Sequence, residues 1–160
     1  MKLDKNEAGI LEPKIQSNLY GYKNHFDTFM TLYKNSRLPN VILMSGYKGL
    51  GKATFAYHFI NYLLSQDELN KYSLKDFMID PNNLTFKLIQ NNMHPNFFLL
   101  DNTPSDENIM INQVRNLIKF LNKSAYSKNI KIVLLDNIEY LSNHSSNALL
   151  KSLEEPPSNT

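Results

Sequence analysis

A glycine-rich segment that ends in a lysine is the part of the sequence whose residue types and spacing could do chemistry. Gly46, Gly51 and Lys52 have the spacing of a phosphate-binding loop, G-x-x-x-x-G-K. In such a loop, backbone N–H groups and the N-terminus of the following helix surround a phosphate, and the lysine adds a positive charge. The expected nucleotide-binding residues are Gly46, Tyr47, Lys48, Gly49, Leu50, Gly51, Lys52, Ala53 and Thr54. A glycine-rich strand-to-helix turn without a ligand is the alternative interpretation.

The residue after the loop lysine departs from this pattern. Ser or Thr normally follows the lysine, and its hydroxyl binds the magnesium ion of the nucleotide. Here the position holds Ala53. Thr54 cannot replace it, because one step along a helix turns a side chain by about a hundred degrees. We therefore expect any bound nucleotide to have one metal ligand fewer.

Asp136 is the second candidate, because it directly follows the apolar run Ile132–Leu135. An acid at the end of a buried strand holds Mg²⁺ in phosphate-loop ATPases; capping of the next helix is the alternative role. The following residue is Asn137, whose amide is a poor general base at neutral pH. Loss of a base lowers a rate by a factor of about 10² to 10⁴. We therefore assign no catalytic residue, and we expect ATP and Mg²⁺ to bind weakly or not at all.

The remaining polar residues indicate no further site. Asp101 also ends an apolar run, but a turn-forming role is favoured for it. The four histidines lack the spacing of metal ligands. The chain contains no cysteine, which excludes disulfides, thiol catalysis and cysteine-ligated metals, and we expect no zinc.

Length and charge restrict the class of protein. The 160 residues suffice for one domain with a core, and 17 basic against 15 acidic residues give a net charge of +2. This balance offers no independent case for binding DNA or a membrane. The polar N-terminus does not resemble a signal peptide. Together with the absence of cysteine, these features favour a cytoplasmic protein.

Apolar periodicity predicts strands that alternate with helices. We expect strands at 41–44, 97–100 and 130–135, and helices at 20–34, 51–65, 81–91, 111–122 and 147–155. We interpret 1–16 as a polar lead-in and 17–160 as one α/β domain with a parallel sheet. Ligands of such folds lie at the carboxyl ends of the strands. Gly46 and Asp136 are both expected there.

Several motifs together resemble the bacterial clamp-loader ATPase family over about residues 17–160. The most specific of them is Asn147–Pro157; Arg37–Asn40, His94-Pro95 and the phosphate loop agree with it. Within the family, the chain resembles the stator-like delta-prime branch more than the hydrolysing gamma/tau branch. Three features carry this: Ala53, Asn137 and the lack of a four-cysteine zinc module.

This resemblance implies a function and a set of partners. It implies an AAA+-type phosphate-loop fold and a non-hydrolysing subunit of the DNA polymerase III clamp loader. Such a subunit helps to load the sliding clamp onto primed DNA, while polymerase activity lies in another subunit. The alternative is an active ATPase subunit of the gamma/tau type. The implied partners are the gamma/tau and delta subunits and, through the complex, the clamp and primed DNA, without a membrane.

The resemblance also has structural implications. The expected subunit-interface residues are Asn147, Lys151, Glu154 and Glu155. In the family, a further strand lies between the first and third strands and would follow Pro157. We therefore expect this chain to be the N-terminal portion of a longer protein that ends before the last strands and the lid. The strand at 41–44 would then lack its neighbour, and the isolated portion would be poorly stable.

Overall fold

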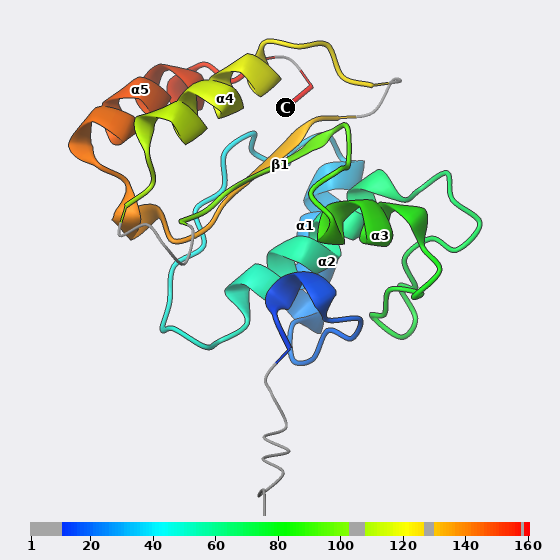
Figure 1. Cartoon of the computed structure of the whole chain (residues 1–160). Helices are drawn as coiled ribbons and strands as arrows, with labels where there is room; N and C mark the ends of the chain where they lie inside the picture. The colour runs from blue at the N-terminus through cyan, green and yellow to red at the C-terminus, as the bar shows by residue number, and fades with distance from the viewer. Residues whose placement is uncertain (1–10, 103–107, 127–129, 158) are drawn as a thin grey trace, which may run out of the picture.

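The computed structural model describes residues 11–102, 108–126, 130–157 and 159–160 (Figure 1). Two parallel strands pair with Phe97 opposite Ile132 and Leu100 opposite Leu135. The helices and strands are α1 (Lys23–Lys34), α2 (Lys52–Leu64), α3 (Leu84–Gln90), β1 (Phe97–Leu100), α4 (Ile111–Leu121), β2 (Ile132–Leu135) and α5 (Asn143–Glu154), with short 3-10 helices at Pro13–Ile15 and Ile138–Tyr140. The expected α/β class with a parallel sheet is confirmed.

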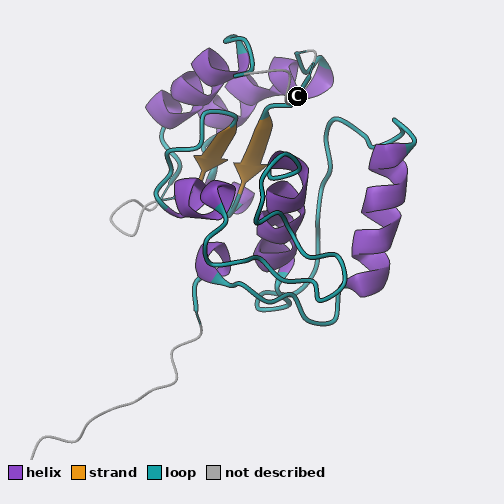
Figure 2. Ribbon diagram, turned by 90° about the vertical axis from the view of Figure 1, so that its right-hand side faces the viewer, coloured by secondary structure: helices purple, strands orange, loops and turns teal. Residues whose placement is uncertain are grey.

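The two strands lie between two layers of helices. In Figure 1, α4 and α5 cover one side of the sheet and α1, α2 and α3 lie on the other, and Figure 2 shows both strand arrows enclosed in this way. Successive strand residues point to opposite faces. Phe98 and Leu100 accordingly pack with α4 and α5, whereas Phe97 and Leu99 pack with α2 and α3. Both strands are apolar because both faces are covered.

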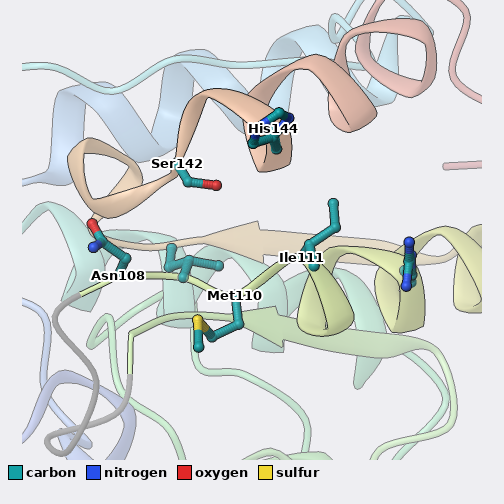
Figure 3. Close-up of a pocket in the computed structure, with 7 residues that line it drawn as sticks. Asn108, Met110, Ile111, Ser142 and His144 are labelled. Carbon is teal, nitrogen blue, oxygen red and sulfur yellow. The ribbon is translucent and has the colours of Figure 1, made fainter.

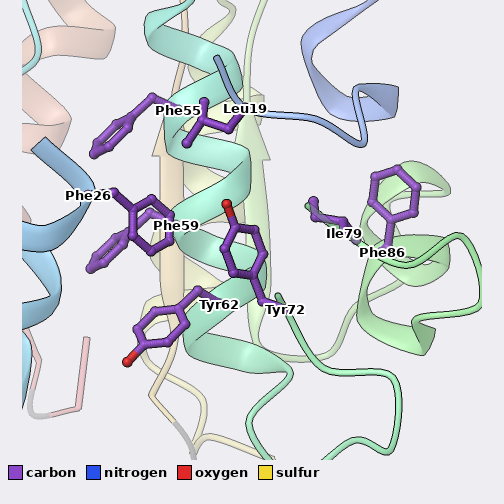
Figure 4. Close-up of a cluster of buried hydrophobic side chains, with 8 residues drawn as sticks. All are labelled: Leu19, Phe26, Phe55, Phe59, Tyr62, Tyr72, Ile79 and Phe86. Atoms are coloured by element: carbon purple, nitrogen blue, oxygen red, sulfur yellow. The ribbon is translucent and has the colours of Figure 1, made fainter. Parts of the chain in front are cut away.

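An aromatic cluster joins α1 to α2 (Figure 4). Its buried members are Leu19, Phe26, Phe55, Phe59, Tyr62, Tyr72, Ile79 and Phe86. Phe26 is fully buried, and its ring centroid lies 5.4 Å from that of Phe59 and 5.1 Å from that of Tyr72. Each such pair contributes about 0.5–1.5 kcal/mol beyond the burial of its area. The cluster therefore fixes α1 against the helix that follows the glycine loop.

Helix α2 is buried on two sides. Phe55, Phe59 and Tyr62 face the aromatic cluster, as the periodicity predicts. Tyr57 and Ile60, however, pack against the sheet. Helix α2 is therefore the central helix, packed between α1 on one side and the sheet on the other.

The segment Val41–Met44 does not form the expected first strand. It has no strand partner among the described residues, and the side chains of Val41, Ile42 and Leu43 are 46%, 40% and 75% exposed. An apolar run becomes a strand only when a neighbour satisfies its backbone groups. The segment is therefore an exposed apolar connection that leads into the glycine loop.

Three helix starts differ from the expected ones, and the first of them is α1, which begins at Lys23 and not at residue 20. Helix α3 begins at Leu84 and not at Pro81, because the Asn83 side chain accepts a hydrogen bond from the backbone N–H of Phe86 at 2.6 Å. Helix α5 begins at Asn143, four residues before the expected start, because the Ser142 hydroxyl caps it by accepting from the Ser145 N–H at 3.2 Å. No helix in the described part of the chain is long and apolar enough to span a bilayer.

Candidate phosphate-binding site

The glycine loop runs directly into the N-terminus of α2. Gly51 is the N-cap residue of this helix, with φ 80°, and Gly49 has φ 87°. Both values lie in the left-handed region, where a side chain would be strained. A Cβ on Gly49 would meet no atom within 4 Å, so backbone conformation and not crowding requires glycine there. The first turn of α2 thus presents free N–H groups toward the loop.

The side chain of Lys52 folds back onto the glycine loop that precedes it. Its Nζ donates hydrogen bonds to the carbonyl oxygens of Gly46 and Tyr47, each at 2.9 Å. The ammonium therefore replaces part of its hydration with loop carbonyls. A phosphate oxygen that entered the loop would compete for this ammonium, as the proposed phosphate-binding role of Lys52 requires.

Tyr22, which was not among the predicted site residues, supports the loop from outside. Its hydroxyl donates to the carbonyl oxygen of Leu50, and a Cβ placed on Gly51 would lie 3.5 Å from its ring. Tyr22 immediately precedes α1 and packs on Phe55 with ring centroids 5.3 Å apart. This contact spans 28 residues of sequence, so no local pattern could have revealed it.

The second half of the candidate site lies where the two strands end. Leu100 and Leu135 are paired, so Asp101 and Asp136 follow on adjacent strands. The Asn137 side chain donates to Asp101 Oδ1 at 2.8 Å and to Asn102 Oδ1 at 3.2 Å. Asp101 Oδ1 also accepts from the N–H of Asn102 at 2.8 Å, which is the expected turn-forming role. The contact with Asn137 is additional and was not predicted.

The electrostatic environment connects Asp136 to the loop lysine. Burial raises the pKa of the Asp136 carboxyl above its ordinary value. The N–H of Asn137 lowers this pKa by donating to Oδ1 at 2.9 Å, the carboxylates of Asp101 and Glu139 raise it, and the charge of Lys52 lowers it. The contribution of Lys52 is the smallest of these, so the two residues predicted from separate motifs are only weakly linked.

The residues present suit a phosphate group better than a metal ion. The loop supplies left-handed glycines, a helix N-terminus and the Lys52 ammonium, which together fit a phosphate. Ala53 offers no oxygen ligand in the first turn of α2. Among the described residues, no group of three or more His, Cys, Asp or Glu side chains could hold a metal. Asp136 is thus a lone acidic candidate for Mg²⁺.

The predicted subunit-interface residues lie away from the loop, on the helix layer across the sheet from α2. The side chains of Asn147, Lys151, Glu154 and Glu155 are all exposed on or just after α5. Leu150, between them, is 51% exposed. The structure therefore leaves this face of α5 uncovered by the rest of the described chain.

An open cavity of about 570 Å³ lies between the starts of α4 and α5 (Figure 3). Its lining residues are Asn108, Ile109, Met110, Ile111, Arg115, Ser142 and His144. None of them was a predicted site residue. The Ser142 hydroxyl already donates to that of Ser145 at 2.9 Å. The cavity does not include any residue of the glycine loop.

Comparison with known proteins identifies the family. The subunit delta' of DNA polymerase III from Pseudomonas aeruginosa is 32% identical over 118 residues, which are 74% of this chain and 34% of that protein. The delta' subunit from Escherichia coli is 27% identical over 84% of this chain and 39% of that protein, and the gamma subunit from Buchnera aphidicola is 26% identical over 91% and 38%. This chain thus spans less than two-fifths of the length of these relatives.

The family model covers most of the chain. The model described as "DNA polymerase III, delta subunit" matches residues 21–160. This match and the delta' relatives confirm the resemblance and the clamp-loader type of fold that the motifs predicted. The chain belongs to this family of DNA polymerase III clamp-loader subunits.

Proposed function

We propose that the protein containing this chain is a non-hydrolysing, stator-like subunit of the DNA polymerase III clamp loader, which helps to load the sliding clamp onto primed DNA in the cytoplasm. The observation that carries this proposal is the composition of the loop and strand-end site. Lys52 and Asp136 occupy the sequence positions expected of a phosphate-binding lysine and a metal-binding acid, while Ala53 and Asn137 stand where an ATPase needs a metal-binding hydroxyl and a base.

The remaining residues of the site support binding more than turnover. Gly46–Thr54 would hold the phosphates of a nucleotide, and Asp136 would face its magnesium ion, which supplies charge neutralisation when bound. The amide of Asn137 does not accept a proton, and it already donates to Asp101. A bound nucleotide would therefore fix the loop and α1 through Lys52 and Tyr22 without being consumed.

The mechanical part of the proposal concerns α5. Its exposed residues Asn147, Lys151, Glu154 and Glu155 would contact a neighbouring gamma/tau or delta subunit. Any influence of ATP hydrolysis elsewhere in the complex must then come from contacts that differ between two states of the assembly. The rigid α2–sheet–α4–α5 stack is suited to holding such a surface in place.

Turnover and nucleotide binding test the first part of the proposal. The full-length protein should release no inorganic phosphate from ATP above background, with or without Mg²⁺. A fluorescent ATP analogue should bind weakly or not at all, and Lys52→Ala should remove whatever binding remains, whereas Lys119→Ala, an exposed site on α4, should not. Magnesium-dependent turnover that Lys52→Ala abolishes and Lys119→Ala preserves would instead establish the gamma/tau-type ATPase.

Assembly tests the second part. The charge reversals Glu154→Lys and Glu155→Lys together should weaken co-purification of the full-length protein with gamma/tau. Asp67→Lys, an exposed acid that precedes α3, is the matched control and should leave assembly unchanged. Equal recovery of gamma/tau by all three proteins would contradict the assignment of α5 as an interface.

A further inference from the structure

The side chain of Asn137 connects the ends of β1 and β2. Its amide nitrogen donates to Asp101 Oδ1 at 2.8 Å and, at the longer distance of 3.2 Å, to Asn102 Oδ1. Asp101 and Asn137 lie 36 residues apart in sequence and belong to different strand ends. The amide thus provides a side-chain link between the two strands just beyond their last backbone pair, Leu100 and Leu135.

The backbone of Asn137 is part of the same arrangement. It has φ 52° and ψ 44°, a left-handed conformation that Asn adopts more readily than most residues with a side chain. In this conformation its N–H donates to Asp136 Oδ1 at 2.9 Å. Asp101 therefore acts on Asp136 through Asn137. Asp101 accepts a hydrogen bond from the side-chain amide of Asn137, and the backbone N–H of Asn137 donates to the carboxylate of Asp136.

Charge explains why an amide occupies this position. The charges of Asp101 and Glu139 both raise the pKa of Asp136, so a further negative charge near the strand ends would meet like charges. A carboxylate at position 137 would face Asp101 without a proton to share, whereas the amide supplies a donor. An acid at position 137 would therefore lose the hydrogen bond to Asp101 and repel its carboxylate.

We propose that Asp101 is a positioning residue, which fixes Asn137 as an amide link between β1 and β2 and thereby orients Asp136. This inference rests on the proposed non-hydrolysing function and deepens it. Position 137, where an ATPase carries its base, here holds an amide that links the two strand ends. A single change of Asn137 to an acid then disrupts the strand ends instead of restoring a base.

An isosteric exchange cycle in the full-length protein tests the link. Asn137→Asp removes the donor and adds a charge, and the melting temperature should fall by about 2–4 °C, the shift expected for about 1 kcal/mol in a domain of this size. Asp101→Asn keeps an acceptor at 101 and should stay within about 1 °C of the parent. The exchanged pair Asp101→Asn with Asn137→Asp places the donor on the other strand and should recover the parent value.

Two controls make the result specific. Asn92 is exposed and has nearly the same left-handed φ, 53°, so Asn92→Asp should leave the melting temperature unchanged. In NMR spectra, the side-chain NH₂ signals of Asn137 should show protection from solvent exchange that Asp101→Ala removes. A merely space-filling Asn137 would show neither this protection nor recovery in the exchanged pair.

Each outcome has a definite meaning. An exchanged pair that melts as low as Asn137→Asp overturns the proposal, and so does an Asn137 side chain unaffected by Asp101→Ala. Phosphate release measured on the same parent sample separates the two levels. Turnover by the parent would contradict the proposed function, whereas failed recovery without turnover would contradict only the role of Asp101.

Discussion

Nδ1 of His58 lies 3.0 Å from the hydroxyl oxygen of Tyr72, and both residues are buried. His58 belongs to α2, whereas Tyr72 lies in the segment between α2 and α3. The Nε2 atom of His58 is also buried and has no hydrogen-bond partner within the described part of the chain. Protonation of this ring would place a charge inside the protein, where the backbone of Gln16 favours it but does not offset the cost of burial.

This burial predicts a loss of stability in acid. Burial lowers the pKa of His58 from 6.5 to about 4. Because the folded-state pKa is below the unfolded one, the contribution is fully present above pH 6.5 and is lost as pH falls from 6.5 through 4. The total loss is about 3 kcal/mol. Urea unfolding between pH 4.5 and 7.5 should show this slope, and His58→Gln should reduce it.

Another histidine provides the control for this titration. His144 is exposed, so His144→Gln should leave the pH dependence unchanged. Burial also lowers the pKa of His94, and a smaller slope should therefore remain in the His58 variant. Equal slopes in the parent and in His58→Gln would show that His58 is not the group responsible.

The missing metal hydroxyl can be supplied by one substitution. Ala53→Thr should raise the affinity for a nucleotide analogue about tenfold in Mg²⁺ and hardly at all in EDTA, equivalent to about 1.4 kcal/mol. Asn116→Thr is the matched control, because it adds the same side chain at an exposed position on α4 and should leave the affinity unchanged. A titration that gives the same affinity for Ala53→Thr and the parent in Mg²⁺ would show that position 53 does not face a metal.

Lys131 stabilises the end of α4. Its side chain is 4% exposed, and its Nζ donates to the carbonyl oxygens of Leu121 and, at 2.6 Å, Lys123. A cation that bonds the last carbonyls of a helix is favourable there. Lys131→Met should lower the free energy of unfolding by about 1–3 kcal/mol, since both carbonyls lose a charged donor. The exposed Lys119→Met should change it by less than about 0.5 kcal/mol.

Asn83 holds the segment between α2 and α3. Its side chain is fully buried. Its Oδ1 accepts hydrogen bonds from the side chain of Asn61 at 2.8 Å and from the N–H of Phe86 at 2.6 Å. Its Nδ2 donates to the carbonyl oxygen of Asn70 at 2.8 Å. Asn83→Ala should therefore cost about 2–3 kcal/mol in chemical denaturation. The exposed neighbour Asn82→Ala should be nearly neutral.

These hydrogen bonds also lead to a prediction about metals. Glu68 adds to them by accepting from the N–H groups of Leu84 and Thr85 at 2.8 and 2.9 Å. Because side chains and backbone order this segment without a metal ligand set, a chelator should not change the melting temperature. A decrease in EDTA that Zn²⁺ reverses would contradict this prediction and the expectation of no zinc.

Local patterns sufficed wherever an element is determined by its own residues. The helix at 111–122 was predicted because Val114, Leu117 and Leu121 recur at helical spacing, and all three are buried. The strand ending at Asp136 was predicted from its apolar run. The early start of α5 could have been found from Ser142, a good N-cap residue followed by a polar first turn.

Long-range contacts account for what the sequence did not predict. Val41–Met44 has the composition of a strand, but a strand also needs a hydrogen-bonded neighbour, and composition carries no information about one. The contact of Asp101 with Asn137 depends on the register of β1 and β2. Tyr22 reaches Leu50 across 28 residues because α1 packs on α2.

The burial of α2 on two sides determines how the glycine loop can move. Amide hydrogens from Phe55 to Leu64 lie between the aromatic cluster and the sheet, so we expect them to exchange with solvent more slowly than those of Val41–Met44. The amides of the loop itself should exchange quickly, although the helix that begins at Lys52 opens only together with the core. We thus expect the loop to open locally while the helix at its far end stays closed with the core.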